Sequence, residues 1–191
     1  MYLEMHARLG GHRLEQWHAL LEAAGLRPDE HAGQTACLYS DDGRLLACGC
    51  LGDGLISCVA VDPAHQSEGL LAAILTALTN AAHDAGRDHL FLYTKPETAS
   101  RFEALGFTAL VETPEAVLME NRAHGLDRFL DRVRHPEARA PVGAIVAHCD
   151  PFTNGHRYLA EMASKRAAVV YLFVLSEDRG RFAARSRGPV A

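Results

Sequence analysis

A charged stretch with two prolines, residues 135–141, separates two parts of this chain that differ in pattern. Before it, short apolar runs alternate with turns rich in Gly, Asp and Ser, which is typical of antiparallel hairpins. After it, an apolar strand, a helix and a second apolar strand predict a parallel β-α-β unit. We therefore expect an α/β protein with an α+β domain at residues 1–134, a linker at 135–142 and a Rossmann-like domain at 143–191.

The spacing of apolar residues predicts the elements of each domain. Helices are expected where apolar side chains recur every three or four positions, over residues 14–24, 70–86, 97–105, 126–133 and 155–166. Strands are expected at short apolar runs, over residues 35–39, 45–51, 55–61, 89–94, 107–111, 116–119, 143–148 and 168–175. One helix cannot cover both faces of the second sheet, so we expect its last strand to be partly exposed.

Composition excludes several classes of function. With 48% hydrophobic and 23% charged residues, the 191-residue chain has the composition of an ordinary globular protein. Its net charge is -5 with both signs interspersed, so we expect no general attraction to nucleic acid or to an anionic membrane. No apolar run is long enough to span a bilayer and the N-terminus lacks an apolar core, which predicts a cytoplasmic protein without a signal peptide.

Four of the five cysteines, Cys37, Cys48, Cys50 and Cys58, lie in strand-like apolar sequence. We interpret them as reduced, buried thiols. Cys48 and Cys50 would share one face of a strand, which could also suit a metal or a redox pair. No second pair with zinc spacing follows, so no metal site is predicted.

The first candidate site is a loop that runs from a strand directly into the helix at residue 70. Free backbone N–H groups and the positive end of the helix meet there, so an anion such as pyrophosphate can bind without a basic side chain. Gly69 would allow close approach of that anion to the backbone. The alternative is that Gly69 only eases the turn.

Gln66-x-x-Gly69 at this position resembles the pyrophosphate loop of the GNAT family of N-acetyltransferases, and residues 101–107, Arg-Phe-Glu-Ala-Leu-Gly-Phe, resemble that family's second hallmark. The resemblance implies a GNAT-like fold and a loop for acetyl-CoA made by Gln66, Gly69, Leu70 and Leu71. The family usually has glycine or alanine where this chain has Leu71, so we expect the coenzyme to be hindered. Tyr93 is a candidate site residue, although a packed strand tyrosine is the favoured interpretation.

The second candidate site is the sequence Asp-Pro-Phe-Thr-Asn-Gly-His at residues 150–156, between an apolar strand and a helix. Thr153 and His156 lie in the first helical turn beside free backbone donors, where they can hold phosphate oxygens and stabilise charge at phosphorus. Gly155 would let a phosphate approach the backbone. The alternative, a plain N-cap and a surface histidine, does not explain the whole run.

This run resembles the (His or Thr)-x-Gly-His signature of the nucleotidyltransferase superfamily. The resemblance implies that Thr153 and His156 are catalytic and that ATP binds with Mg²⁺. It also implies a group of ATP-binding residues around them: His148, Cys149, Asp150, Pro151, Phe152, Asn154 and Gly155.

A GNAT-like domain joined to a Thr-x-Gly-His domain resembles the acetate:citrate lyase ligases, through about Phe182. That resemblance implies an enzyme of citrate fermentation that activates acetate with ATP as acetyl-AMP. The acetyl group would then pass to the thiol prosthetic group on the acyl carrier subunit of citrate lyase. Two alternatives stay open: an acetyltransferase that uses acetyl-CoA, and a noncatalytic module that binds the lyase.

The family's adenylating domain normally continues with further strands and a second motif that contacts the triphosphate. We therefore expect the second domain of this chain to be incomplete and poorly ordered. We also expect adenylation of acetate to be weak or absent.

Overall fold

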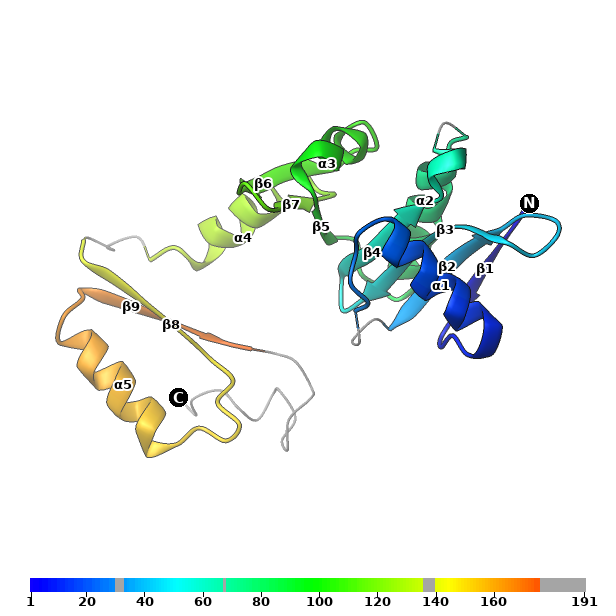
Figure 1. Cartoon of the computed structure of the whole chain (residues 1–191). Coiled ribbons are helices and arrows are strands. Elements are labelled where there is room, and N and C mark those ends of the chain that lie inside the picture. The colour runs from blue at the N-terminus through cyan, green and yellow to red at the C-terminus, as the bar shows by residue number, and fades with distance from the viewer. Residues whose placement is uncertain (30–32, 67, 136–139, 176–191) are drawn as a thin grey trace. The chain divides into compact units, whose positions relative to one another are not determined.

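The computed structural model describes residues 1–29, 33–66, 68–135 and 140–175 (Figure 1). The chain divides into two compact units, Met1–Gly125 and Leu126–Ala191, and each unit has its own sheet. No helix in the described part of the chain is long and apolar enough to cross a membrane.

The first unit is built on a seven-stranded sheet with the order β1-β2-β3-β4-β5-β7-β6 (Figure 1). Its strands are β1 (Tyr2–His6), β2 (Gln34–Tyr39), β3 (Leu45–Gly52), β4 (Leu55–Val61), β5 (Phe91–Thr94), β6 (Thr108–Glu112) and β7 (Val117–Glu120). All neighbours pair antiparallel except β4 and β5, which pair parallel only at Leu55–Phe91 and Ile56–Leu92. Beyond these two pairs β4 and β5 separate, and a cavity opens between them.

Helices α1 (Gly11–Ala23) and α2 (Leu70–Asp84) cover opposite faces of this sheet. Successive residues of β2 point to different faces: Ala36 packs into the core cluster that contains α2, and Cys37 into the cluster that contains α1. Each helix contributes apolar residues at helical spacing, so burial of both apolar faces holds the three layers together. Helix α3 (Pro96–Glu103) follows β5, and a short 3₁₀ helix, η1 (Pro63–His65), follows β4.

A β-bulge interrupts the pairing of β3 with β4. Cys50 pairs with Ser57 and Cys48 with Ala60, so β4 has one more residue than β3 between these two pairs. Cys58 lies in the bulge with a left-handed φ of 52°.

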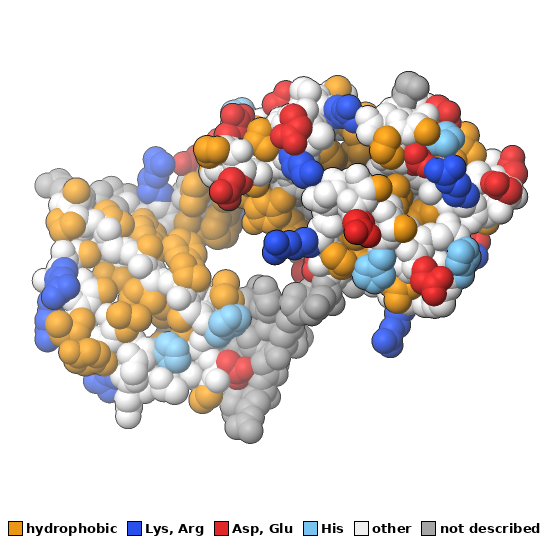
Figure 2. All heavy atoms as spheres, in the orientation of Figure 1, with side chains coloured by type: hydrophobic (Ala, Val, Ile, Leu, Met, Phe, Trp, Pro, Cys, Tyr) orange, Lys and Arg blue, Asp and Glu red, His pale blue; other side chains and the backbone are white. Residues whose placement is uncertain are grey.

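The second unit contains the β-α-β unit that the sequence predicts. Strand β8 (Val142–Ala147), helix α5 (Asn154–Ser164) and strand β9 (Val169–Val174) follow one another, and the two strands pair in parallel along their whole length. Every residue of β9 is half-buried, which confirms the expected partial exposure. Figure 2 shows hydrophobic side chains gathered on the visible face of this unit. Helix α4 (Gly125–Val133) precedes it in the chain.

The fold class is confirmed: a mixed α/β sheet of GNAT-like topology and a short parallel sheet. The sequence did not predict β1. Its residues are exposed or half-buried at the edge of the sheet, so they form no apolar run. The strand predicted at residues 89–94 starts only at Phe91. The domain boundaries stay a prediction, and the tail after residue 175 lies outside the described residues.

Candidate functional sites

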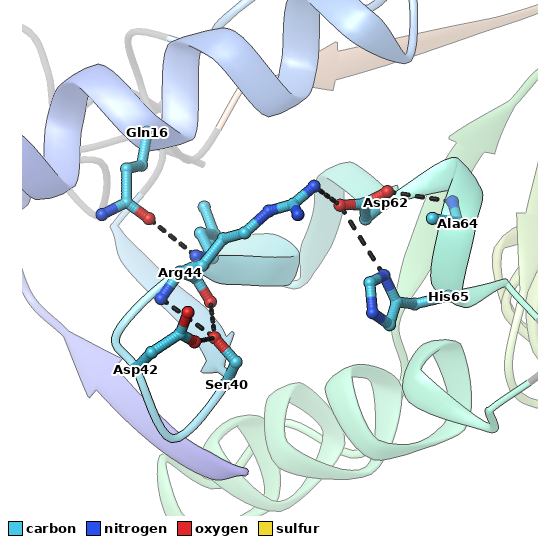
Figure 3. Close-up of polar contacts among 8 residues, drawn as sticks. Gln16, Ser40, Asp42, Arg44, Asp62, Ala64 and His65 are labelled. Atoms are coloured by element: carbon cyan, nitrogen blue, oxygen red, sulfur yellow. Dashed lines mark hydrogen bonds and ion pairs between the residues drawn. The ribbon is translucent and has the colours of Figure 1, made fainter.

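A polar network around Asp62 fixes the start of the loop after β4 (Figure 3). Asp62 Oδ1 accepts a hydrogen bond from the Ala64 N–H at 2.9 Å, while Oδ2 pairs with Arg44 and lies 3.7 Å from His65 Nδ1. The Ala64 N–H, together with the nearby Arg44 and His65, lowers the pKa of this nearly buried carboxyl below its usual range. The loop therefore leaves β4 in a defined direction.

The same network reaches the β2–β3 turn and α1 (Figure 3). Gln16 of α1 accepts a hydrogen bond from the Leu45 N–H at 2.6 Å and donates to the Gly43 carbonyl at 3.3 Å. The Arg44 N–H donates to Ser40 Oγ at 3.0 Å. The network thus joins three segments that are distant in sequence: α1, the β2–β3 turn and the loop after β4.

The four residues of the predicted coenzyme A loop have different surroundings in the structure. Gln66 and Leu71 line the cavity between β4 and β5. Gly69 is the N-cap of α2 with a left-handed φ of 72°, and a Cβ there would meet nothing within 4 Å. Its backbone conformation rather than crowding therefore favours glycine. Leu70 turns into the core and is only 3% exposed.

The cavity has a volume of about 340 Å³ and is lined by β4, the loop, β5, α3 and the end of α1. Arg101 Nη1 donates to Gln66 Oε1 at 3.1 Å, and Lys95 Nζ donates to the Ala24 carbonyl at 3.0 Å. These two cations, balanced by one lining carboxylate, Glu97, suit a ligand with anionic and apolar parts.

Tyr93 also lines the cavity and is 60% exposed, so the interpretation of a packed strand tyrosine is wrong. Its neighbour on β5, Leu92, packs into the core cluster that contains α2, so Tyr93 points to the opposite face of the sheet. Cys58 and Lys95 are lining residues that the sequence did not indicate. The bulge sets the position of Cys58, and the apolar pattern of a strand does not reveal a bulge.

The second candidate site is the turn between β8 and α5. Thr153 is the N-cap of α5, and its N–H donates to His156 Nδ1 at 3.1 Å. The Thr153 hydroxyl lies 2.8 Å from the same nitrogen. Because Nδ1 accepts the backbone hydrogen bond, the neutral imidazole carries its proton on Nε2. The Phe152 ring stacks on His156 with centroids 5.6 Å apart, so the imidazole is held from two sides.

The other predicted ATP-binding residues surround this turn. Cys149 is fully buried with a left-handed φ of 49°, Asp150 is half-buried, and His148 and Pro151 are exposed at the end of β8. Asn154 and Gly155 are the first two residues of α5 and are exposed. A Cβ on Gly155 would lie 3.5 Å from Thr153 Oγ1, which is ordinary contact. The fold itself therefore tolerates a side chain at this position.

Known protein sequences resemble the chain in both units. Residues 142–190 match the family described as the citrate lyase ligase C-terminal domain. The [Citrate [pro-3S]-lyase] ligase of Escherichia coli K12 is 41% identical over 145 residues, which are 74% of this chain and 41% of that protein. The ligase of the same name from Haemophilus influenzae is 34% identical over 179 residues, 92% of this chain and 53% of that protein. The chain thus spans about half the length, or less, of these relatives.

Solved structures resemble the first unit in fold. An acyl-CoA N-acyltransferase from Pseudomonas aeruginosa matches with a TM-score of 0.52 and 19% identity, over 63% of this chain and 97% of that one. The N-acetylglutamate synthase of Neisseria gonorrhoeae, complexed with coenzyme A and N-acetyl-glutamate, matches with a TM-score of 0.51 and 21% identity. That match covers 65% of this chain and 36% of the synthase. At these identities the likeness concerns the fold alone.

Proposed function

The chain is a homologue of the citrate lyase ligases over most of its length, and from this premise we propose that it acts as an acid–thiol ligase. Acetate attacks the α-phosphorus of ATP, which gives acetyl-AMP and pyrophosphate. The thiol prosthetic group on the acyl carrier subunit of citrate lyase then attacks the acetyl carbon and releases AMP. We infer a cytoplasmic reaction, because the proposed chemistry consumes ATP.

The observation that carries the proposal is the geometry of Thr153 and His156. Nδ1 of His156 is occupied by the Thr153 N–H, so Nε2–H is left to donate to a phosphate oxygen. That donor lies in the first turn of an 11-residue helix, whose free N–H groups and positive end also favour a phosphate. Donors held in place before the reaction stabilise the additional charge that develops at phosphorus.

Mg²⁺ would accompany the triphosphate and neutralise part of its charge. Within the described ranges, no group of three or more His, Cys, Asp and Glu side chains gathers as a metal site. A hard cation that keeps several waters and binds mainly to phosphate oxygens fits such surroundings. Asp150, which is half-buried, is the carboxylate within the turn itself.

The direct test is acetate-dependent release of pyrophosphate from ATP by the purified chain. We expect slow release that His156→Ala lowers by about 10²- to 10³-fold, because one preorganised donor at phosphorus is lost. Release that needs no acetate, or that is the same in His156→Ala, would overturn the proposal.

Gly155→Ala separates ligand binding from folding. The added methyl has ordinary contact distance within the chain, so the circular dichroism and thermal midpoint should stay close to those of the wild type. If phosphate approaches the backbone at Gly155, ATP affinity measured by calorimetry should fall by about tenfold or more. Unchanged ATP affinity would mean that no phosphate approaches the backbone at Gly155.

A second candidate function is binding of acetyl-CoA in the first unit, as a GNAT-type acetyltransferase would require. It is favoured by the cavity with Gln66 and Arg101 on its wall and by the fold shared with a synthase complexed with coenzyme A. Leu71 on the same wall narrows the space available to the coenzyme. We therefore expect Leu71→Ala to bind acetyl-CoA more tightly than the wild type in a thermal-shift titration.

A noncatalytic role is the third possibility, in which the first unit binds citrate lyase. Co-purification of the lyase with the chain in the absence of ATP, retained in His156→Ala, would favour it. Loss of the complex when ATP and acetate are withheld would favour the ligase.

A further inference from the structure

Four thiols lie on the α1 side of the sheet in the first unit. Cys37, Cys48 and Cys50 are fully buried in the core cluster that contains α1, and Cys58 packs against that cluster. All are free thiols. Within the described residues no group of three or more His, Cys, Asp and Glu side chains could hold a metal ion.

The β-bulge brings Cys58 next to Cys50. In a regular strand Ser57 and Cys58 would point to opposite faces, but here both point toward the α1 side. The Ser57 hydroxyl donates to Asp29 at 2.8 Å, and the Cys58 thiol donates to the Arg27 carbonyl at 3.5 Å, both in the segment that follows α1. Since Ser57 is the direct partner of Cys50, Cys58 is its diagonal neighbour across the strands.

The two thiols differ in access. Cys58 is half-buried and lines the cavity between β4 and β5, whereas Cys50 is fully buried behind it. A reagent in the cavity therefore reaches Cys58 first. Access and a neighbouring thiol are the two features of a cysteine that is oxidised and then forms a disulfide.

The pKa shifts of the two thiols also favour reaction at Cys58 before Cys50. A hydrogen bond from Cys50 lowers the pKa of Cys58 below that of an ordinary thiol, although burial and the Asp29 carboxylate oppose this. The Cys50 pKa is raised by its hydrogen bond to Cys58 and by burial, although a hydrogen bond from Thr35 opposes this. The reactive thiolate thus forms at Cys58, and Cys50 keeps its proton.

We propose that Cys58 and Cys50 form a redox pair in which Cys58 reacts with a peroxide and Cys50 resolves the product as a disulfide. The Cys58 thiolate attacks one peroxide oxygen and the O–O bond breaks; with one proton this gives Cys58 sulfenic acid and water. Cys50 sulfur then attacks Cys58 sulfur, the S–O bond breaks, and the thiol proton leaves with the hydroxide as water. One peroxide is reduced by two electrons, and two thiols become one disulfide that links β3 to the bulge of β4.

The test treats the purified full chain with one equivalent of hydrogen peroxide, alkylates the remaining thiols with N-ethylmaleimide and maps the peptides by mass spectrometry. We expect one cross-linked peptide that joins Cys50 to Cys58, lighter by two hydrogen atoms and reversed by dithiothreitol. A cross-link that joins Cys48 to Cys37 or to Cys58, or full alkylation of Cys58 after peroxide, would overturn the proposal. This measurement needs no variant, so it does not depend on the folding of a mutant.

Variants assign the roles of the two thiols. In Cys50→Ser, Cys58 should stop at the sulfenic acid, which dimedone traps. In Cys58→Ser, peroxide consumption should fall by about tenfold or more, because the accessible thiolate is gone. Cys37→Ala, which removes a buried thiol of the same cluster, should still form the Cys50–Cys58 cross-link. Equal peroxide consumption in Cys58→Ser and the wild type would count against Cys58 as the first thiol oxidised.

Discussion

At the scale of single residues, Asp62 makes stability depend on pH. Its pKa is lowered in the folded state, so its contribution is present above the usual carboxyl pKa of about 3.9 and is lost as pH falls through the lower folded value. We expect Asp62→Asn to reduce stability at neutral pH by about 1 kcal/mol, through loss of the charged partner of Arg44 and the Ala64 N–H.

Urea unfolding followed by the fluorescence of Trp17, the single tryptophan and a core residue of the first unit, measures this effect. The difference between Asp62→Asn and the wild type should shrink when the pH is lowered to about 3. An equal difference at both pH values would mean that the ionised carboxylate does not contribute.

The candidate residues show what a local pattern can predict. Thr153 and His156 could be named as candidates from sequence because both lie in one helical turn, where they also contact each other. The exposure of Tyr93 and the position of Cys58 depend on how far β4 and β5 stay paired and on a bulge. Both are long-range properties, so the sequence pattern left them undetermined.

At the scale of elements, Gly49 sets how closely α2 packs on β3. A Cβ at this position would lie 2.8 Å from Ile74 Cγ2 and 2.9 Å from Leu78 Cδ1, so these side chains or the helix that carries them would have to shift. We expect Gly49→Ala to destabilise the first unit by roughly 1–3 kcal/mol in the same fluorescence-monitored unfolding.

A double-mutant cycle separates this contact from intrinsic strand propensity. Leu78→Ala removes one of the two groups that the new methyl would meet. The free-energy loss of the double variant should therefore be smaller than the sum of the single losses. If the free-energy losses of the two single variants add strictly, the new methyl makes no unfavourable contact with Leu78.

Most elements could be predicted because each has its own spacing of apolar residues and is bounded by residues typical of turns or helix ends. Helix α2 has apolar residues at helical spacing, and the turns between β2, β3 and β4 are short. Strand β1 could not be predicted, since an edge strand without buried residues has no apolar run. The parallel pairing of β4 with β5 was not predicted from the residues either, because it joins strands that are separated by α2.

At the scale of the whole molecule, burial is unequal between the two units. Both core clusters lie in the first unit, and Cys149 is the single buried hydrophobic residue among the described residues of the second. Val146 and Tyr158 of the second unit are 65% and 64% exposed. Hydrophobic burial is the main favourable contribution to folding, so the second unit has much less of it per residue.

We therefore expect the second unit to be cleaved first in limited proteolysis with thermolysin, a protease that cuts beside apolar residues. Local opening needs little free energy where few apolar contacts are lost, so cleavage should start in β8, α5 or β9. A fragment that contains all of β1 to β7 should persist, and mass spectrometry identifies its end. Trp17 fluorescence should stay constant during this cleavage, because the tryptophan belongs to the first unit. Loss of the Trp17 signal at the same rate as the full-length chain would instead mean that the two units unfold together.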